Sequence, residues 1–132
     1  MKVACIQLSS GEDYNKNFKD IVKYINQAIV NKADLIITPE TSSLMSADKN
    51  NLFKYSYEMK HDPIINKVKI IAKTKKKWIL LGSMCIKEKS KLRNRSILIG
   101  PKGKINTYYD KINMFDVKVS KKEQHKESKT YS

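Results

Sequence analysis

The sequence contains few cysteines and no long hydrophobic run, and each shortage excludes a class of protein. Cys5 and Cys85 are the only cysteines among 132 residues and lie within apolar stretches, so we expect reduced, buried thiols in a cytoplasmic protein rather than a disulfide framework. No apolar run approaches the roughly 18 residues of a membrane span. The apolar run at 3–8 fits a first β-strand better than a signal peptide.

Arginine and acidic residues are also scarce. The chain has 27 basic and 13 acidic residues and a net charge of +14, as many nucleic-acid-binding proteins do. However, Arg93 and Arg95 are the only arginines, and the lysines are spread along the whole chain. Because arginine makes the bidentate contacts that read bases and phosphates, we interpret the charge as mostly solvated surface and do not expect a nucleic-acid partner. His61 and His125 are isolated, so we expect surface histidines and neither a metal nor a cofactor.

The first 40 residues predict a strand, a helix and a second strand. Apolar residues recur at steps of three and four over 15–30, which indicates an amphipathic helix after the strand at 3–8. Leu35, Ile36 and Ile37 form a short apolar run that is typical of a strand buried on both faces. This spacing predicts a right-handed βαβ unit with parallel strands, and therefore an α/β fold.

The rest of the chain predicts a second helix followed by a β-hairpin. Asp62 and Pro63 form a typical helix start, and a lysine triplet at 75–77 falls in the last turn of that helix. Before this helix, residues 41–60 are expected to form a long loop with a short helix near 52–59. After it, further strands are expected at 78–86, 96–99 and 104–109, with a turn at 100–103. By composition, residues 120–132 are expected to be a disordered tail.

Glu40 is the first candidate for chemistry. Pro39 ends the second strand, so Glu40 follows the carboxyl end of a core strand, where open α/β folds bind ligands. A carboxylate there would be partly desolvated, with a raised pKa, and would suit a general base. On these residues alone, however, an acid that merely opens the following loop is the favoured interpretation.

Three motifs in order extend this hypothesis. They are Thr38-Pro39-Glu40, then Tyr109-Asp110-Lys111-Ile112-Asn113-Met114-Phe115-Asp116, then Glu127-Ser128-Lys129-Thr130-Tyr131-Ser132. Together with the opening 2–8 and the hairpin 94–103, they resemble the carbon–nitrogen hydrolase (nitrilase) superfamily, particularly its amidase branch with omega-amidase and deaminated-glutathione amidase. The resemblance implies that Glu40 acts as general base and acid, that Lys111 stabilises the oxyanion, and that Glu127 positions substrate and lysine. It also implies a small-molecule amide substrate and a cysteine nucleophile further along the chain.

The chain departs from the family pattern in three ways. Met114 replaces a usual leucine, Asn113 replaces a common histidine, and the sequence stops at Ser132, before the nucleophile. We therefore expect residues 1–132 to form a single, incomplete domain, the N-terminal half of a nitrilase-type α-β-β-α sandwich with one apolar sheet face uncovered.

Two function classes follow from this sequence. The first is an amidase fragment that is inactive alone, because it carries the Glu-Lys-Glu part of the site without the cysteine. It would bind its amide substrate if completed by a C-terminal half, which a complementing second chain would supply. The resemblance also implies a homodimer as an alternative partner, because the family commonly dimerises. The second class is a non-catalytic basic binding module, and a degraded gene product is a further alternative.

Overall fold

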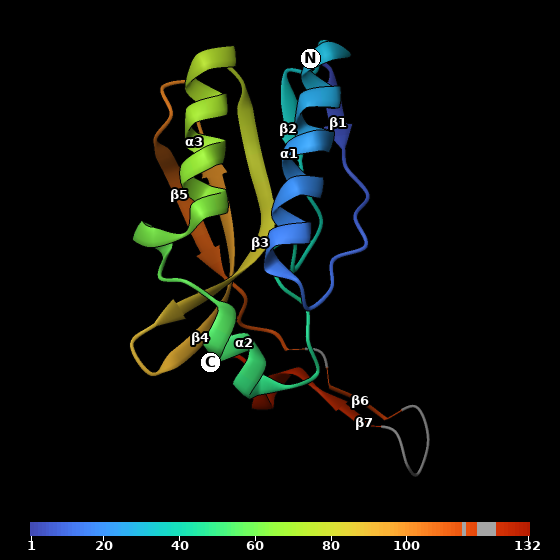
Figure 1. Ribbon diagram of the computed structural model, residues 1–132, viewed down its shortest axis with the longest axis vertical. Coiled ribbons are helices and arrows are strands. Elements are labelled where there is room, and N and C mark those ends of the chain that lie inside the picture. The colour runs from blue at the N-terminus through green and yellow to red at the C-terminus, as the bar shows by residue number, and fades with distance from the viewer. Residues whose placement is uncertain (115, 119–123) are drawn as a thin grey trace.

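The computed structural model describes residues 1–114, 116–118 and 124–132 and shows a mixed five-stranded sheet. The strand order is β1-β2-β3-β4-β5; the first three strands are parallel, and β4 and β5 extend the sheet antiparallel (Figure 1). The strands are β1 (Val3–Cys5), β2 (Leu35–Ile37), β3 (Trp78–Glu88), β4 (Lys91–Ile99), β5 (Ile105–Asp110) and the separate pair β6 (Asp116–Lys118) and β7 (Gln124–Lys126). The helices are α1 (Tyr14–Val30), α2 (Lys49–Tyr55), α3 (Pro63–Lys75) and two short 3-10 helices, η1 (Met59–His61) and η2 (Glu127–Lys129).

The predicted strand–helix–strand unit is confirmed. α1 joins β1 to β2, which are parallel neighbours, and it begins where the Asp13 side chain accepts a hydrogen bond from the Lys16 amide. β1 is shorter than the expected 3–8: it ends at Cys5, although the Ile6 amide still donates to the Ile37 carbonyl at 2.8 Å. The α/β class predicted from sequence is therefore present.

α3 begins at the Asp62–Pro63 pair that the sequence indicated. The Asp62 carboxylate accepts hydrogen bonds from the amides of Ile64 and Ile65, at 2.9 and 3.1 Å, and proline occupies a position that needs no amide hydrogen. The Tyr14 hydroxyl donates to the same carboxylate oxygen at 2.7 Å, which ties the start of α1 to the start of α3. Burial raises the pKa of the Asp62 carboxyl, and these donors oppose that shift.

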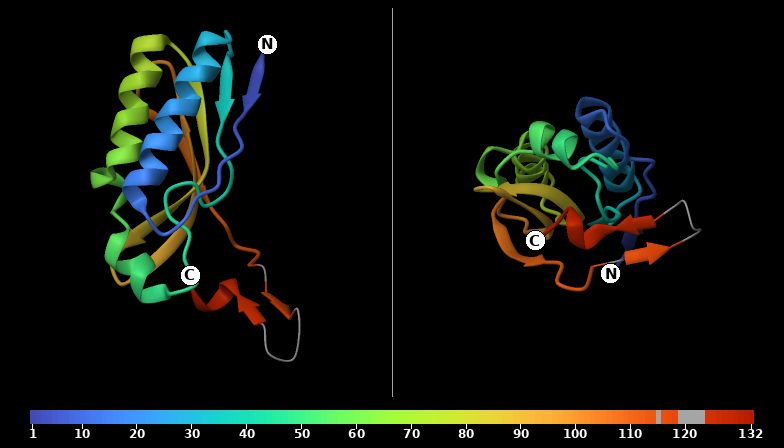
Figure 2. Two further views of the ribbon diagram at one scale, coloured as in Figure 1. Left: turned by 45° about the vertical axis from the view of Figure 1, so that its right-hand side comes forward. Right: turned by 90° about the horizontal axis from the view of Figure 1, so that it is seen from below.

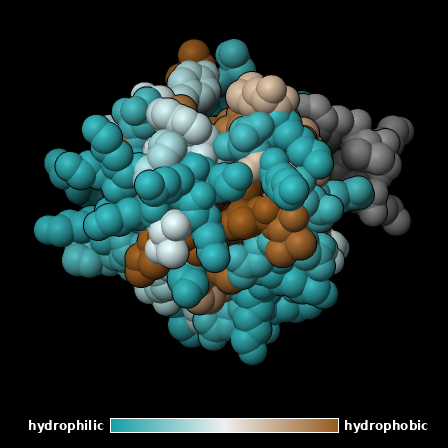
Figure 3. Space-filling view, turned by 90° about the horizontal axis from the view of Figure 1, so that it is seen from above, coloured by the Kyte–Doolittle hydropathy of each residue, from teal (hydrophilic) through white to brown (hydrophobic). Residues whose placement is uncertain are grey.

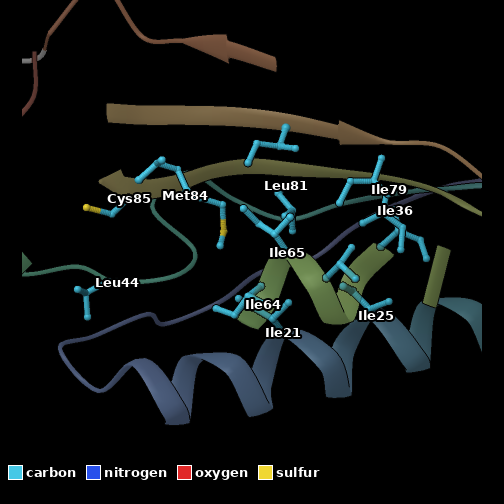
Figure 4. Close-up of a cluster of buried hydrophobic side chains, with 14 of the residues drawn as sticks. Ile21, Ile25, Ile36, Leu44, Ile64, Ile65, Ile79, Leu81, Met84 and Cys85 are labelled. Carbon is cyan, nitrogen blue, oxygen red and sulfur yellow. The ribbon is translucent and has the colours of Figure 1, made fainter. Parts of the chain in front are cut away.

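The hydrophobic core lies between the two long helices and one face of the sheet. Figures 2 and 4 show α1 and α3 side by side on that face, with their apolar side chains directed at β2 and β3. Fully buried members of this core are Ile21, Ile25, Ile36, Ile64, Ile65, Ile79, Leu81 and Met84. Each such side chain contributes about 1.5–3 kcal/mol when it leaves water, so this packing holds the helices in place.

Among the described residues, no helix lies against the opposite face of the sheet over β1, β2 and the adjoining part of β3 (Figure 2). Only the end of this face at Cys85 and Asn94 is covered, by the C-terminal end of α2 and by η2. Register and strand alternation place seven apolar side chains on this open face: Val3, Cys5, Leu35, Ile37, Trp78, Leu80 and Leu98. Two expectations are therefore wrong. β2 is buried on one face only, through Ile36, and Cys5 is exposed because β1 is an edge strand whose outer face is bare.

Other segments are more ordered than the sequence suggested. The helix expected near 52–59 is α2, which begins earlier because Asp48 accepts a hydrogen bond from the Asn50 amide. β4 begins at Lys91 and not at 96. The expected disorder is wrong for the described part of the tail, 124–132, where Glu127 and Tyr131 are buried.

The lysine-rich surface is mostly hydrophilic. Figure 3, seen from the end at which α1 and α3 terminate, shows teal side chains surrounding a smaller hydrophobic patch. α3 ends at Lys75, and the following residue, Lys76, has left-handed backbone angles, so of the lysine triplet only Lys75 is helical. His61 is exposed as expected, and the side chain of His125 lies outside the described residues. No helix in the described ranges has the length and apolar character needed to cross a membrane.

A bulge in β3 lets the Glu40 segment lie directly on the sheet. The pairing of β3 with β4 shifts between Leu81 and Met84, at Gly82 and Ser83. A side chain at Gly82 would place its Cβ only 2.0 Å from the Thr38 carbonyl oxygen, so glycine is required there. The Gly82 amide donates to the Thr38 hydroxyl at 3.1 Å, and the Thr41 amide donates to the Ser83 hydroxyl at 2.7 Å.

We expect Gly82→Ala to destabilise the chain by about 1–3 kcal/mol, because an added methyl group forces this backbone apart. Thermal or urea unfolding measures the change. Gly11→Ala is the matched control, since a Cβ at Gly11 meets nothing within 4 Å. Equal stability of the two variants would show that the close approach at Gly82 is not a constraint.

Candidate functional site

The structure brings Glu40, Lys111 and Glu127 together from three separate segments. Glu40 follows β2, Lys111 directly follows β5, and Glu127 is the first residue of η2. Lys111 Nζ donates to Glu40 Oε1 at 2.8 Å and to Glu127 Oε2 at 2.9 Å. An ammonium group thus lies between two carboxylates; that these residues are catalytic stays a prediction.

Asn94 is a fourth member of this cluster. Its side-chain nitrogen donates to Glu40 Oε1 at 2.9 Å and to Glu127 Oε1 at 3.1 Å, and the residue is 3% exposed. Asn94 lies in the hairpin 94–103 that resembles the family, and the sequence alone assigns no role to this residue. The signal that was available is alternation: Asn94 is a polar residue on the same strand face as Leu92 and Leu98.

Strand ends and local hydrogen bonds position each member. The backbone carbonyl of Asn94 accepts a hydrogen bond from the Lys111 amide at 2.9 Å. Just before Lys111, Asp110 receives two hydrogen bonds from the buried Arg95 guanidinium, at 2.7 and 2.9 Å. This bidentate pair fixes the end of β5 against β4 and so fixes where the Lys111 side chain starts.

The segment that carries Glu127 is held by the end of the preceding motif. Asp116 accepts hydrogen bonds from the Ser128 amide at 3.1 Å and from the Ser128 hydroxyl at 2.6 Å. The amides of Thr130 and Tyr131 both donate to the Glu127 carbonyl, which closes the turn. The second and third motifs of the sequence are therefore in direct contact. Phe115, which belongs to the second motif, lies outside the described residues.

Burial differs strongly across the cluster. The Glu127 side chain is 8% exposed, the Lys111 side chain 28% and the Glu40 side chain 55%. Desolvation alone would lower the pKa of Lys111, but the hydrogen bonds and negative charges of Glu40 and Glu127 outweigh it and hold that pKa above its ordinary value. The interaction is therefore fully present below the ordinary lysine pKa of about 10.4 and is lost only as the pH rises through the higher folded-state value.

A cleft of about 380 Å³ opens beside the cluster. Its lining comprises Glu40, Thr41, Met45, Ser46, Leu52, Lys111, Glu127, Thr130 and Tyr131. Glu40 Oε1 accepts from both Lys111 and Asn94, whereas Glu40 Oε2 makes no hydrogen bond with the part of the chain that the structure describes. That oxygen is therefore the one available to accept a proton.

No cysteine lines this cleft. Cys85 pairs with Asn94 across β3 and β4 but is 1% exposed, and the Ser56 hydroxyl donates to its sulfur at 3.1 Å. Burial raises the pKa of the Cys85 thiol, which disfavours the nucleophilic thiolate, so the prediction of a core thiol is confirmed for this residue. Cys5 lies on the open face of β1. Within the described ranges no group of three or more histidine, cysteine or acidic residues is arranged to hold a metal ion.

The cleft offers two kinds of group that acyl transfer uses, a carboxylate and a fixed ammonium, and its lining contains no thiol. A half-exposed carboxylate with one oxygen available can take a proton, and an ammonium fixed by two carboxylates can stabilise a developing oxyanion without moving. Both groups face a cleft of a size that admits a small molecule.

Comparison with known proteins identifies the family of this chain. Residues 2–132 match the carbon-nitrogen hydrolase family. The deaminated glutathione amidase of Yersinia enterocolitica is 30% identical over 98% of this chain and 46% of its own length, and the probable hydrolase nit2 of Schizosaccharomyces pombe is 28% identical over 96% and 47%.

Solved structures share the fold. The Caenorhabditis elegans NitFhit protein superposes with a TM-score of 0.85 at 25% identity, covering 98% of this chain and 32% of that chain. Nit3 of Saccharomyces cerevisiae, a nitrilase superfamily member, gives a TM-score of 0.79 at 22% identity, with 100% and 48% covered. The chain thus spans about half the length, or less, of these relatives. Over its own length, from residue 2 to residue 132, it belongs to the carbon-nitrogen hydrolase family.

Proposed function

We propose that this chain supplies the acid–base and oxyanion-stabilising part of a thiol amidase that hydrolyses the carbon–nitrogen bond of a small amide. The observation that carries the proposal is the position of Lys111 Nζ, 2.8 Å from Glu40 Oε1 and 2.9 Å from Glu127 Oε2. The match to the carbon-nitrogen hydrolase family over residues 2–132 supports it.

In the first half of the proposed reaction, an acyl group moves from nitrogen to sulfur. Glu40 takes the proton of a cysteine thiol, and the sulfur attacks the amide carbon. The Lys111 ammonium donates to the oxygen that becomes negative in the tetrahedral intermediate. When the carbon–nitrogen bond breaks, Glu40 returns the proton to the leaving nitrogen, which departs as ammonia and leaves a thioester.

In the second half, Glu40 removes a proton from water as the water oxygen attacks the thioester carbon. The carbon–sulfur bond breaks, the sulfur recovers the proton, and a carboxylic acid is released. Glu127 keeps Lys111 charged and in place through both halves, because its buried carboxylate accepts from Lys111 at 2.9 Å. No redox partner and no metal enter this sequence of steps.

The thiol in this proposal comes from the remainder of the family fold, which we place against the open face. The chain covers 46% of the Yersinia amidase and 47% of the fission-yeast hydrolase, so a part of comparable size is needed to complete a family domain. The open face is apolar, and Val3 and Trp78 on it are 44% and 40% exposed. Alternation along β4 places Asn94 and Leu98 on the same side, so a layer that covers this face also approaches the Glu–Lys–Glu cluster.

We expect the chain alone to release no ammonia from small ω-amides above background. Mixed with a polypeptide that continues the family domain and carries its cysteine, the chain should release ammonia. In that mixture, Glu40→Gln should lower kcat/KM about 10²- to 10⁴-fold, because the group that carries the proton is lost. The surface variant Glu58→Gln is the control and should leave the rate unchanged. Full activity of Glu40→Gln in the mixture would refute the role given to Glu40.

We expect Leu80→Lys to block association with the completing part. Leu80 is half-buried at the middle of the open face. A lysine there would place an unpaired ammonium under the completing part, and because burying such a charge costs several kcal/mol, binding should weaken at least about 100-fold. Sedimentation or calorimetry of the mixture measures the loss. Ile70→Lys, on the outer side of α3 where Ile70 is 61% exposed, introduces the same charge and should bind normally. Unchanged binding of Leu80→Lys would place the completing part elsewhere.

A further inference from the structure

Asn94 contacts all three members of the cluster, and the proposed chemistry gives it no step. Its side-chain nitrogen donates to Glu40 and Glu127, and its backbone carbonyl oxygen accepts from the Lys111 backbone amide. We infer that Asn94 is a positioning residue, which orients both carboxylates around the ammonium and leaves Glu40 Oε2 as the oxygen that exchanges protons. The inference rests on the proposed function for its catalytic consequence, although its geometric part stands alone.

The chemistry of the amide group suits this task. A side-chain amide nitrogen carries two hydrogens, and here each is directed to a different carboxylate, at 2.9 and 3.1 Å. Both neighbours are hydrogen-bond acceptors, which fixes the nitrogen of the amide, and not its oxygen, toward them. One planar group therefore sets the separation of Glu40 Oε1 from Glu127 Oε1.

The location of Asn94 gives the cluster a rigid reference point. Asn94 is 3% exposed within β4, which is paired with β3 on one side and β5 on the other. Glu40 and Glu127, in contrast, extend from a loop and from a short 3-10 helix. The Glu40 side chain is 55% exposed and would turn freely in water without a partner, so the strand supplies the order that the loop lacks.

A purely structural Asn94, buried in a strand only to satisfy its own amide, is the competing explanation. The two roles differ in their effect on Lys111. If Asn94 holds the carboxylates beside the ammonium, its loss frees Glu40 to turn toward water and weakens the forces that keep Lys111 protonated. If Asn94 only fills the strand, its loss lowers stability and leaves the titration of Lys111 as it is.

The test is the titration of Lys111 in the full chain, followed by NMR of ¹³C-methylated lysines with the Lys111 signal assigned from Lys111→Arg. Asn94→Leu keeps the volume and removes both donors, and it should lower the pKa of Lys111, because the two carboxylates are no longer held beside the ammonium. Asn94→Ala also removes both donors, with a smaller side chain, and should shift that pKa in the same direction. Asn106→Leu, at an exposed position of β5, is the control and should change nothing.

An unchanged Lys111 pKa in a folded Asn94→Leu variant overturns the inference. If that variant does not fold, Asn94→Ala decides: a lowered pKa supports the inference, and an unchanged one overturns it. The titration needs neither thiol nor substrate, so it separates this inference from the proposed amidase function. In the completed enzyme, Asn94→Leu should lower kcat about 100-fold with little change in KM. If the completed enzyme without this substitution has no amidase activity, the proposed function is refuted and the titration result still stands.

Discussion

The ammonium group of Lys111 is the contact on which the candidate site depends. It joins a loop after β2, the end of β5 and the final segment of the chain, which are remote in sequence. Without a cation between them, Glu40 and Glu127 would be two negative charges that both accept from the Asn94 amide, and the buried Glu127 carboxylate would lose its ion pair with Lys111. The net charge of +14 does not replace this ammonium, because lysines in water are screened within about 8–10 Å. One well-placed lysine therefore matters more here than the remaining basic residues together.

Precision at Lys111 comes from groups that take no part in the proposed reaction. Arg95, whose side chain is 5% exposed, binds Asp110 through two hydrogen bonds and lies 4.2 Å from the ring centre of Tyr108. On the opposite side of the cluster, the bulge at Gly82 lets the backbone before Glu40 lie against β3. Both devices act on backbone that adjoins a site residue, and neither lines the cleft. The site is thus assembled by the ends of strands rather than by the loops themselves.

The sequence predicted the elements whose patterns are local, and it failed where tertiary contacts decide. The periodicity of α1 and the Asp62–Pro63 start of α3 are local signals, and both are confirmed. The early part of β4 was missed because four of its first five residues are charged or polar. It pairs with β3 along the hairpin, where Arg93 and Arg95 both form ion pairs with Glu88.

The same distinction applies to the tail and to the site. A polar composition suggested disorder over 120–132, yet Tyr131 is buried beside Cys85, a contact that no local pattern reveals. The positions of Lys111 and Glu127 came from family resemblance, since each would otherwise pass as an ordinary surface residue. Asn94 was identifiable in principle, because alternation sets it on the face of Leu98, but only the register of β4 against its neighbours shows that this face carries the cluster.

The bare apolar face of the sheet and the Glu–Lys–Glu cluster adjoin each other through β4. A sheet with helices on one face leaves its other face in water, and here that face carries Ile37, Leu80 and Leu98. Alternation along β4 puts Asn94 on the same side, so the carboxylates that it holds lie at one end of the bare apolar surface. A layer that removes this surface from water would also cover the cluster, lower the local dielectric and strengthen the charge interactions of Lys111. Under the proposed function, hydrophobic association with the completing part and the delivery of its thiol to the cluster would then be a single event.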